Sequence, residues 1–173
     1  ARTDVDLVIY EPDTDPPVRI VRNAETNLGD LCADAYRYMS GADVAFVNGG
    51  GVRTNIDTGD ITYGEIIQVH PFGNMLCMVE ATGQEILDAL EMGARVVPEE
   101  SGGFLQVSGL TYEIHTYIPS SVTLDANGLF VSVDGEYRVK NVMIGGEPID
   151  LTKTYTLAGH DYMLKNAGDG YTM

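Results

Sequence analysis

Residues 27–53 read NLGDLCADAYRYMSGADVAFVNGGGVR, which places a helix signal, a strand signal and a glycine loop in immediate succession. Apolar side chains recur at helical spacing in the first half: Leu28, Leu31, Cys32, Ala35 and Met39. Asn27 is the expected N-cap, and Gly41 lies just past the expected end of the helix. The apolar run Val44–Val47 then predicts a buried strand that leads into a tight glycine loop.

The rest of the chain adds two helix starts and several short strands. Thr62 is followed by Glu65, and Thr82 by Glu85, at the spacing of a capping box. Runs that predict strands cover residues 5–10, 74–80, 110–115, 137–144 and 154–158. Early helices and a sheet assembled from distant strands predict an α+β fold, with a mixed β-sheet and packed helices in one domain over residues 1–173.

Charge and composition limit the kinds of partner that this chain is expected to bind. The 173 residues carry a formal net charge of −16, which disfavours binding to a nucleic-acid polymer. No run approaches the roughly 20 apolar residues that span a bilayer. Cys32 and Cys77 both lie among apolar residues, so we expect buried thiols, with a disulfide as the alternative. Because the chain opens on Ala1 and stops at Met173, we expect it to be a piece of a longer protein.

Three segments are candidates for a binding site. The loop from Asn48 to Arg53 lets a ligand approach backbone closely and supplies an arginine, although a strained turn alone is the alternative. Arg19 and Arg22 are expected on one face of an extended segment, where Arg22 would grip a phosphate together with Arg53 unless both form surface ion pairs. Two aromatic residues, Phe72 and Tyr162, are candidates to stack on a base or to serve as core or rim residues.

Metal chemistry and autonomous catalysis are not expected within this chain. His70, His115 and His160 are far apart in the sequence and form no pair at metal-ligand spacing. No P-loop and no nucleophile elbow is present. We therefore expect no catalytic residue, no metal ligand and no cofactor here.

Six blocks in a fixed order resemble the C-terminal, substrate-binding domain of the 5'-nucleotidases. They are Glu25–Asp30, Asn48–Arg53, Gly59–Thr62, Pro71–Asn74, Phe104–Leu110 and Gly168–Tyr171. The resemblance implies that an N-terminal metallophosphoesterase domain, outside this chain, carries two divalent metal ions. It also implies that this chain binds a nucleotide or nucleoside, and that the protein is extracellular, periplasmic or at the cell surface.

The resemblance also assigns residues to roles. Arg22 and Arg53 become phosphate or ribose contacts, Asn48 and Gly50 line the pocket, Phe72 stacks on the base, and Asp169 binds the ribose hydroxyls. The second stacking position falls on Tyr162 or Met163, because the segment is one residue longer than the family pattern; we favour Tyr162 because stacking needs a flat ring. Alternatives are a 2',3'-cyclic-nucleotide phosphodiesterase, a UDP-sugar hydrolase, or a non-catalytic surface interaction module of the same fold.

Overall fold

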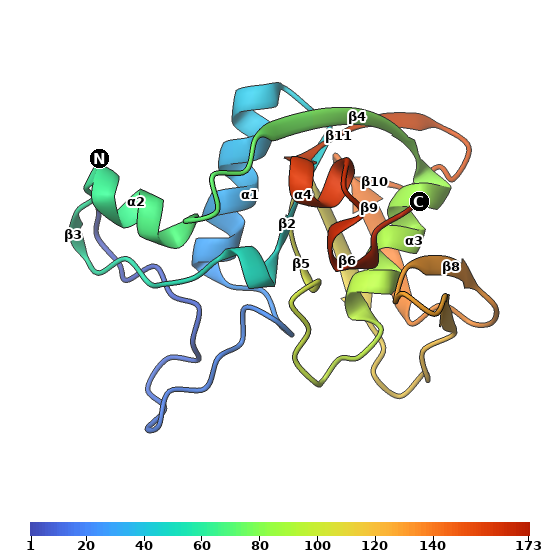
Figure 1. The fold of residues 1–173 in the computed structure, drawn as a ribbon, viewed down its shortest axis with the longest axis horizontal. Helices are drawn as coiled ribbons and strands as arrows, with labels where there is room; N and C mark the ends of the chain where they lie inside the picture. Colours follow the sequence, from blue (N-terminus) through green and yellow to red (C-terminus); the bar gives the residue numbers. More distant parts are fainter.

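A four-stranded mixed sheet forms the centre of the computed structural model, which describes all of residues 1–173 (Figure 1). The strand order is β4-β11-β2-β5, with β4 Leu76–Thr82, β11 Thr154–His160, β2 Val44–Asn48 and β5 Leu105–Ser108. Strands β11 and β2 run parallel, and the other neighbours are antiparallel. Strands far apart in the sequence thus meet in one sheet, which confirms the predicted α+β fold.

Two helices cover the two faces of this sheet. Helix α1 (Asn27–Ser40) packs on β5 and β2, and helix α3 (Gly83–Ala94) lies on the opposite side. The alternation of β2 sets this arrangement, because Phe46 joins the core beneath α3 while Val47 joins the core beneath α1. A fully buried strand between two helical layers accounts for the apolar run predicted from the sequence.

The remaining elements are short and extend the sheet core on both sides (Figure 1). One small sheet contains β6 Leu110–Ile114, β9 Val139–Ile144 and β10 Glu147–Pro148. Two separate two-stranded sheets form from β7 Val122–Leu124 with β8 Phe130–Val133 and from β1 Arg2–Thr3 with the distant β3 Gly59–Asp60. Helices α2 Tyr63–Val69 and α4 Asp161–Leu164 and the 3₁₀ turns Gly49–Gly51 and Gly168–Gly170 complete the fold.

The helix ends follow the sequence signals with one correction. Both capping boxes, at Thr62 and at Thr82, are formed. The N-cap of α1 is Thr26 rather than Asn27, because the Thr26 hydroxyl accepts a hydrogen bond from the Gly29 amide at 3.1 Å. The side chain of Asn27 instead donates to the carbonyl of Asp6 at 2.9 Å and so fixes the N-terminal segment.

The N-terminal segment departs from the prediction that residues 5–10 form a strand. Only two isolated bridges occur there, between Leu7 and Ile56 and between Tyr10 and Arg19. Side-chain amides take the backbone donors that a neighbouring strand would have bound; the Ile9 amide donates to Asn55 Oδ1 at 2.9 Å. Side-chain partners of this kind satisfy the backbone donors, so no ladder to a neighbouring strand is needed.

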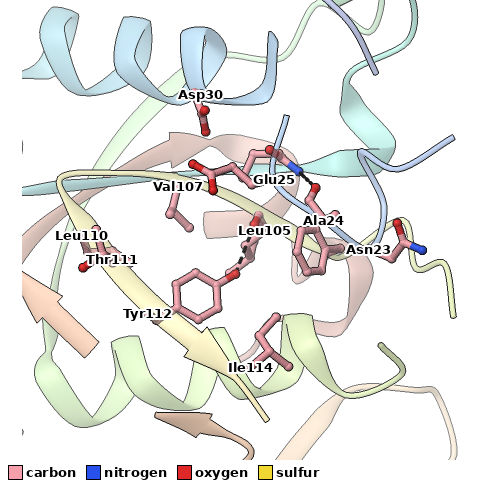
Figure 2. Close-up of a pocket in the computed structure, with 12 residues that line it drawn as sticks. Asn23, Ala24, Glu25, Asp30, Leu105, Val107, Leu110, Thr111, Tyr112 and Ile114 are labelled. Atoms are coloured by element: carbon pink, nitrogen blue, oxygen red, sulfur yellow. Dashed lines mark hydrogen bonds between the residues drawn. The ribbon is translucent and has the colours of Figure 1, made fainter. Parts of the chain in front are cut away.

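A cavity of about 250 Å³ lies between β5, β6 and the segment that precedes α1 (Figure 2). Its walls combine apolar side chains such as Ile114 with polar ones such as Asn23 and Asp30. Burial raises the pKa of the Asp30 carboxyl to about 6, with the neighbouring carboxylates of Glu25 and Asp34 adding to the shift.

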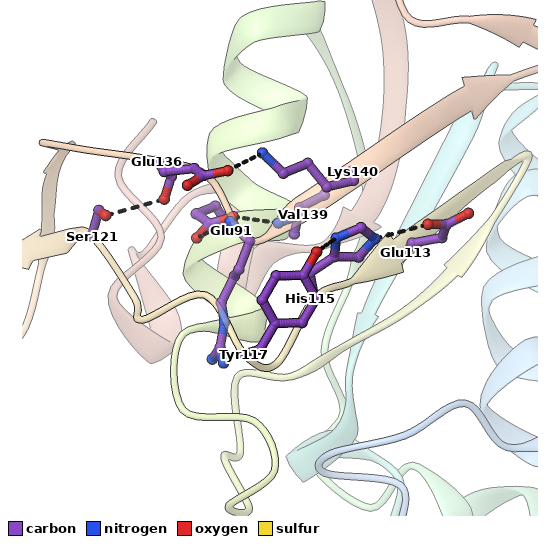
Figure 3. A network of polar contacts seen from close by, with 9 residues as sticks. Glu91, Glu113, His115, Tyr117, Ser121, Glu136, Val139 and Lys140 are labelled. Carbon is purple, nitrogen blue, oxygen red and sulfur yellow. Dashed lines mark hydrogen bonds and ion pairs between the residues drawn. The ribbon is translucent and has the colours of Figure 1, made fainter.

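A buried carboxylate joins α3 to the small sheet of β6, β9 and β10 (Figure 3). Glu91 has no exposed surface, and its two oxygens accept hydrogen bonds from the backbone amides of Arg138 at 3.1 Å and Val139 at 2.8 Å. The Arg138 guanidinium donates in turn to the carbonyl of Ala94 at 2.9 Å. Buried polar groups are tolerated when they are bonded in this way, so the network fixes the start of β9 against α3.

Two further features concern the cysteines and the helices. Cys32 and Cys77 are both buried free thiols. None of the helices combines the length and the apolar character that crossing a bilayer demands.

Candidate functional site

A cleft of about 370 Å³ opens at one edge of the central sheet. Five separate segments line it, through Arg22, Asn48, Gly50, Gly51, Phe72, Asn74, Gly102, Tyr162 and Asp169. Its location follows from topology: β2 ends at Asn48 and β11 ends at His160, and because the two strands are parallel, their carboxyl ends meet at the same edge. Ligands of α/β sheets bind in crevices at such edges.

The glycine loop forms one wall because three backbone segments approach there more closely than side chains would allow. The Gly49 amide donates to the carbonyl of Phe104 at 2.7 Å, and the Gly50 amide donates to that of Gly102 at 2.8 Å. A Cβ atom on Gly49 would lie 2.0 Å from the carbonyl oxygen of Val21. The glycines therefore serve close packing against the turn that carries Arg22.

A polar network holds the floor of the cleft. Asn48 Nδ2 donates to Asp169 Oδ2 at 2.6 Å, and the Tyr162 hydroxyl donates to Asp169 Oδ1 at 3.2 Å. Asn48 Oδ1 must then accept, so His160 Nε2, at 2.9 Å, carries the hydrogen. Burial lowers the pKa of His160, which keeps the imidazole neutral at pH 7. The Asp169 carboxylate is thus fixed in place and retains lone pairs for a ligand.

The two predicted arginines differ in their position. Arg22 lines the cleft, and its pKa is lowered by burial and then by the neighbouring charges of Arg19 and Arg53. Neither Arg22 nor Arg53 forms an ion pair with a carboxylate. Arg53 lies at the rim, where it donates to the carbonyl of Gly50 at 3.2 Å and its guanidinium carbon lies 5.8 Å from the centre of the Phe72 ring.

The prediction that Arg19 and Arg22 share one face was wrong. Residues 21–24 form a turn rather than a strand, and side chains three positions apart in a strand point to opposite faces in any case. Arg19 points to Glu100 and forms a two-pronged ion pair with distances of 2.7 and 2.8 Å. Only Arg22 of this pair is directed into the cleft.

The two aromatic side chains lie on the same cleft. Phe72 is 60% exposed and Tyr162 is 41% exposed, and both line the cavity. Met163, the alternative for the second stacking position, is 2% exposed and belongs to the core beneath α3. The structure therefore places Tyr162, and not Met163, where a flat ligand could be stacked.

Sequence reasoning missed part of the site. Asn74 and Gly102 also line the cleft, and His160 supports it from below. Asn74 lies within a motif block that the sequence had already singled out, so a signal for it existed. Gly102 and His160 carry no local signal, because their roles depend on contacts with residues more than 50 positions away in the chain.

The side chains present do not fit a metal ion. Nowhere in the chain do three or more His, Cys, Asp or Glu side chains gather in a way that could hold one. His70 and His160 both lie beside the Tyr36 ring, with ring centres 5.9 and 6.2 Å from it, and no third ligand completes a metal site with them. What this chain offers a ligand is a stacking surface, a fixed carboxylate and two unpaired guanidinium groups.

Comparison with known proteins adds a family to this geometry. The family described as "5'-nucleotidase, C-terminal domain" matches residues 1–173. A 5'-nucleotidase of Vibrio cholerae is 36% identical over 152 residues, which cover 88% of this chain and 24% of that protein. The trifunctional nucleotide phosphoesterase YfkN of Bacillus subtilis is also 36% identical, over 81% of this chain and 10% of its own length.

Solved structures agree with this comparison. The crystal structure of a 5'-nucleotidase precursor from Thermus thermophilus matches with a TM-score of 0.79 and 35% identity, covering 99% of this chain and 31% of that one. A sulfate thiohydrolase, SoxB, matches with a TM-score of 0.69 at 19% identity, which is a likeness of fold alone. The chain thus spans about a quarter of the curated 5'-nucleotidase and about a third of the solved one.

Proposed function

This chain belongs to the 5'-nucleotidase C-terminal domain family, and we propose that it is the nucleotide-recognition domain of a metal-dependent 5'-nucleotidase. The proposed reaction of the whole protein converts nucleoside 5'-phosphates to nucleoside and phosphate. One observation carries the proposal: six of the seven residues expected from the sequence line one cleft, and the seventh, Arg53, lies at its rim.

The cleft offers one group for each part of a nucleotide. Phe72 and Tyr162 would hold the base between flat faces, which favours any base with a π-surface. The fixed carboxylate of Asp169 would accept hydrogen bonds from the ribose diol. Arg22, with Arg53 at the rim, would bind the phosphate through charge-assisted hydrogen bonds.

The proposed division of labour assigns the hydrolytic step to another part of the polypeptide. An N-terminal metallophosphoesterase domain would supply two divalent metal ions that activate water. The residues of this chain would bind the nucleoside and orient the ester for attack, while Arg22 stabilises negative charge on the phosphate. We propose an extracellular, periplasmic or cell-surface location for the protein, and we expect the chain alone to release no phosphate from AMP even with added divalent metal.

Specificity within the family has a second candidate. YfkN, a trifunctional nucleotide phosphoesterase, is as similar in sequence as the 5'-nucleotidase of Vibrio cholerae. The runner-up is a 2',3'-cyclic-nucleotide phosphodiesterase or a UDP-sugar hydrolase built from the same two domains, and substrate profiling of the full-length protein would separate these activities. A non-catalytic interaction module would need no intact pocket, so the complete set of cleft residues favours the enzyme.

Calorimetric titration of the chain with AMP and with adenosine tests the binding role. Phe72→Ala should weaken both ligands by about 1–3 kcal/mol, which is about 5- to 150-fold, because it removes one stacking surface. Tyr38→Ala is the matched control, since Tyr38 is an exposed aromatic residue on α1 that does not line the cleft. Equal and weak binding by the wild-type chain and by both variants would contradict the proposed function.

A further inference from the structure

Arg22 projects from a turn that no regular element contains. Residues 21–24 form this turn between the N-terminal segment and α1. Its far side is not filled, because Asn23 and Ala24 form a wall of the 250 Å³ cavity in Figure 2. A segment that borders a cavity loses packing contacts on that side, so hydrogen bonds have to fix its position.

One buried side chain of the central sheet supplies those bonds. Gln106, in the middle of β5, is 2% exposed. Its Nε2 donates to the carbonyl of Val21 at 3.0 Å and to that of Ala24 at 2.7 Å. Its Oε1 accepts from the amide of Thr26 at 3.1 Å. The two donor bonds thus hold the residues on either side of Arg22 and Asn23.

The orientation of this amide is determined by its partners. A flipped side chain would place the NH₂ group against the Thr26 amide and the oxygen against two carbonyls, so all three bonds would be lost. The first turn of α1 also closes over the group, because a Cβ atom on Gly29 would lie 2.1 Å from Gln106 Oε1. Gln106 therefore has one conformation available.

The other hydrogen bonds of the turn run to irregular segments. The Val21 amide donates to the carbonyl of Ile9 at 3.2 Å, the Ser101 amide donates to the carbonyl of Arg22 at 2.9 Å, and Asn23 Nδ2 donates to the carbonyl of Pro98 at 2.9 Å. Gln106 alone connects the turn by hydrogen bonds to a strand of the sheet that also carries Asn48. Gln106 therefore fixes the position of Arg22 relative to Asn48 and the rest of the cleft.

We propose that Gln106 is a positioning residue for substrate phosphate, acting through Arg22 from outside the cleft. The inference rests on the proposed nucleotide-binding function. Only a neutral amide supplies two donors and one acceptor at this site; a glutamate would set negative charge against two carbonyls, and a methionine would leave them without partners. Loss of Gln106 should therefore affect the phosphate of the ligand and spare its base and ribose.

The test compares AMP with adenosine as ligands of the 173-residue chain, by calorimetric titration. Gln106→Met keeps the length of the side chain and should weaken AMP by about 10-fold, the effect of one charge-assisted bond, while adenosine changes less than about 2-fold. Arg22→Ala should do the same, and Gln106→Met should add no further loss in the Arg22→Ala background. Ser108→Ala is the control, because Ser108 lies two positions along β5 and binds Asp34 instead of the turn.

The titrations distinguish a positioning role of Gln106 from a general structural one. Equal losses for AMP and adenosine would show a general structural role and overturn the inference, as would an unchanged affinity for AMP. If Arg22→Ala itself leaves AMP binding intact, the proposed phosphate contact fails, which is a different result from failure of Gln106→Met alone. Should the methionine variant not fold, Gln106→Glu, which keeps the shape and the acceptor for Thr26, is measured with the same expectation.

Discussion

Adding one methyl group at Gly49 should separate the glycine loop from the turn that carries Arg22. Gly49 has an ordinary negative φ, so its backbone would accept alanine without strain. The obstacle is space, since the new Cβ would lie 2.0 Å from the oxygen and 2.9 Å from the carbon of the Val21 carbonyl. Both are backbone atoms, which cannot rotate away as a side chain would. Gly49→Ala must therefore move the loop or the turn.

The structure sets the size of the effect. The Cβ would be about 1.4 Å short of the 3.4 Å at which ordinary contact begins. A displacement of that size breaks either the bond from the Gly49 amide to Phe104 or the bond from Gln106 to Val21. Overpacking costs about 1–3 kcal/mol, and one lost buried hydrogen bond costs about 1 kcal/mol more. We expect the free energy of unfolding to fall by about 2–4 kcal/mol.

Urea denaturation measures this directly. With a slope of about 2 kcal/mol/M, the midpoint should fall by about 1–2 M. Gly64→Ala is the matched control, because Gly64 lies exposed in α2 with nothing closer than 3.9 Å to its Cβ position. That variant should be neutral or more stable by about 0.5–1 kcal/mol. A loss below about 1 kcal/mol for Gly49→Ala, or an equal effect at both positions, would refute the reasoning.

Three further predictions concern the core, the cavity beside Asp30 and the stacking position. Glu91→Leu leaves two buried backbone amides without acceptors, so urea denaturation should show the free energy of unfolding reduced by about 2–4 kcal/mol. The control Glu136→Ala, on the surface, should change it by less than about 0.5 kcal/mol. Burial and two neighbouring carboxylates raise the folded pKa of Asp30 to about 6, so the stability that Asp30 contributes should be fully present below its unfolded pKa of 3.8 and be lost as pH rises through about 6. Asp30→Asn should flatten that slope in urea titrations at pH 5 and pH 7.5; an unchanged slope would contradict it. Tyr162→Ala should weaken the binding of AMP by about 5- to 150-fold with little loss of stability. Met163→Ala should instead lower the free energy of unfolding by about 2–5 kcal/mol and leave binding almost unchanged. A Met163→Ala effect confined to binding would show that Met163, and not Tyr162, holds the second stacking position.

Local patterns predicted the framework of this protein well. Helix α1, strand β2 and the glycine loop follow from residues 27–53, because helical periodicity, an apolar run and consecutive glycines each act over a few residues. The capping boxes at Thr62 and Thr82 also act locally, through bonds between residues three positions apart. The ordered motifs then identified the family, which the match over the whole chain confirms.

What could not be predicted depends on contacts between distant segments. Arg19 and Arg22 have the same chemistry and nearly the same position in the chain, but Glu100, 81 positions further on, binds only the first. The choice between Tyr162 and Met163 depends on which side chain the core beneath α3 accepts. Gln106 and His160 act by holding other residues, and their partners lie more than 75 positions away. No window of local sequence contains that information.

The cleft concentrates positive charge within a chain whose net charge is −16. Arg19 is neutralised by Glu100, but Arg22 and Arg53 have no carboxylate partner, and the lowered pKa of Arg22 shows that burial and the neighbouring cations act against its charge. Holding cations without an ion-pair partner near each other costs free energy, which the carboxylates of Glu100 and Asp169 offset in part and a bound anion would offset further. A neutral nucleoside leaves the repulsion in place, whereas a phosphate removes it. The preference for nucleotide over nucleoside should therefore reside in these two arginines, while the aromatic pair contributes equally to both ligands.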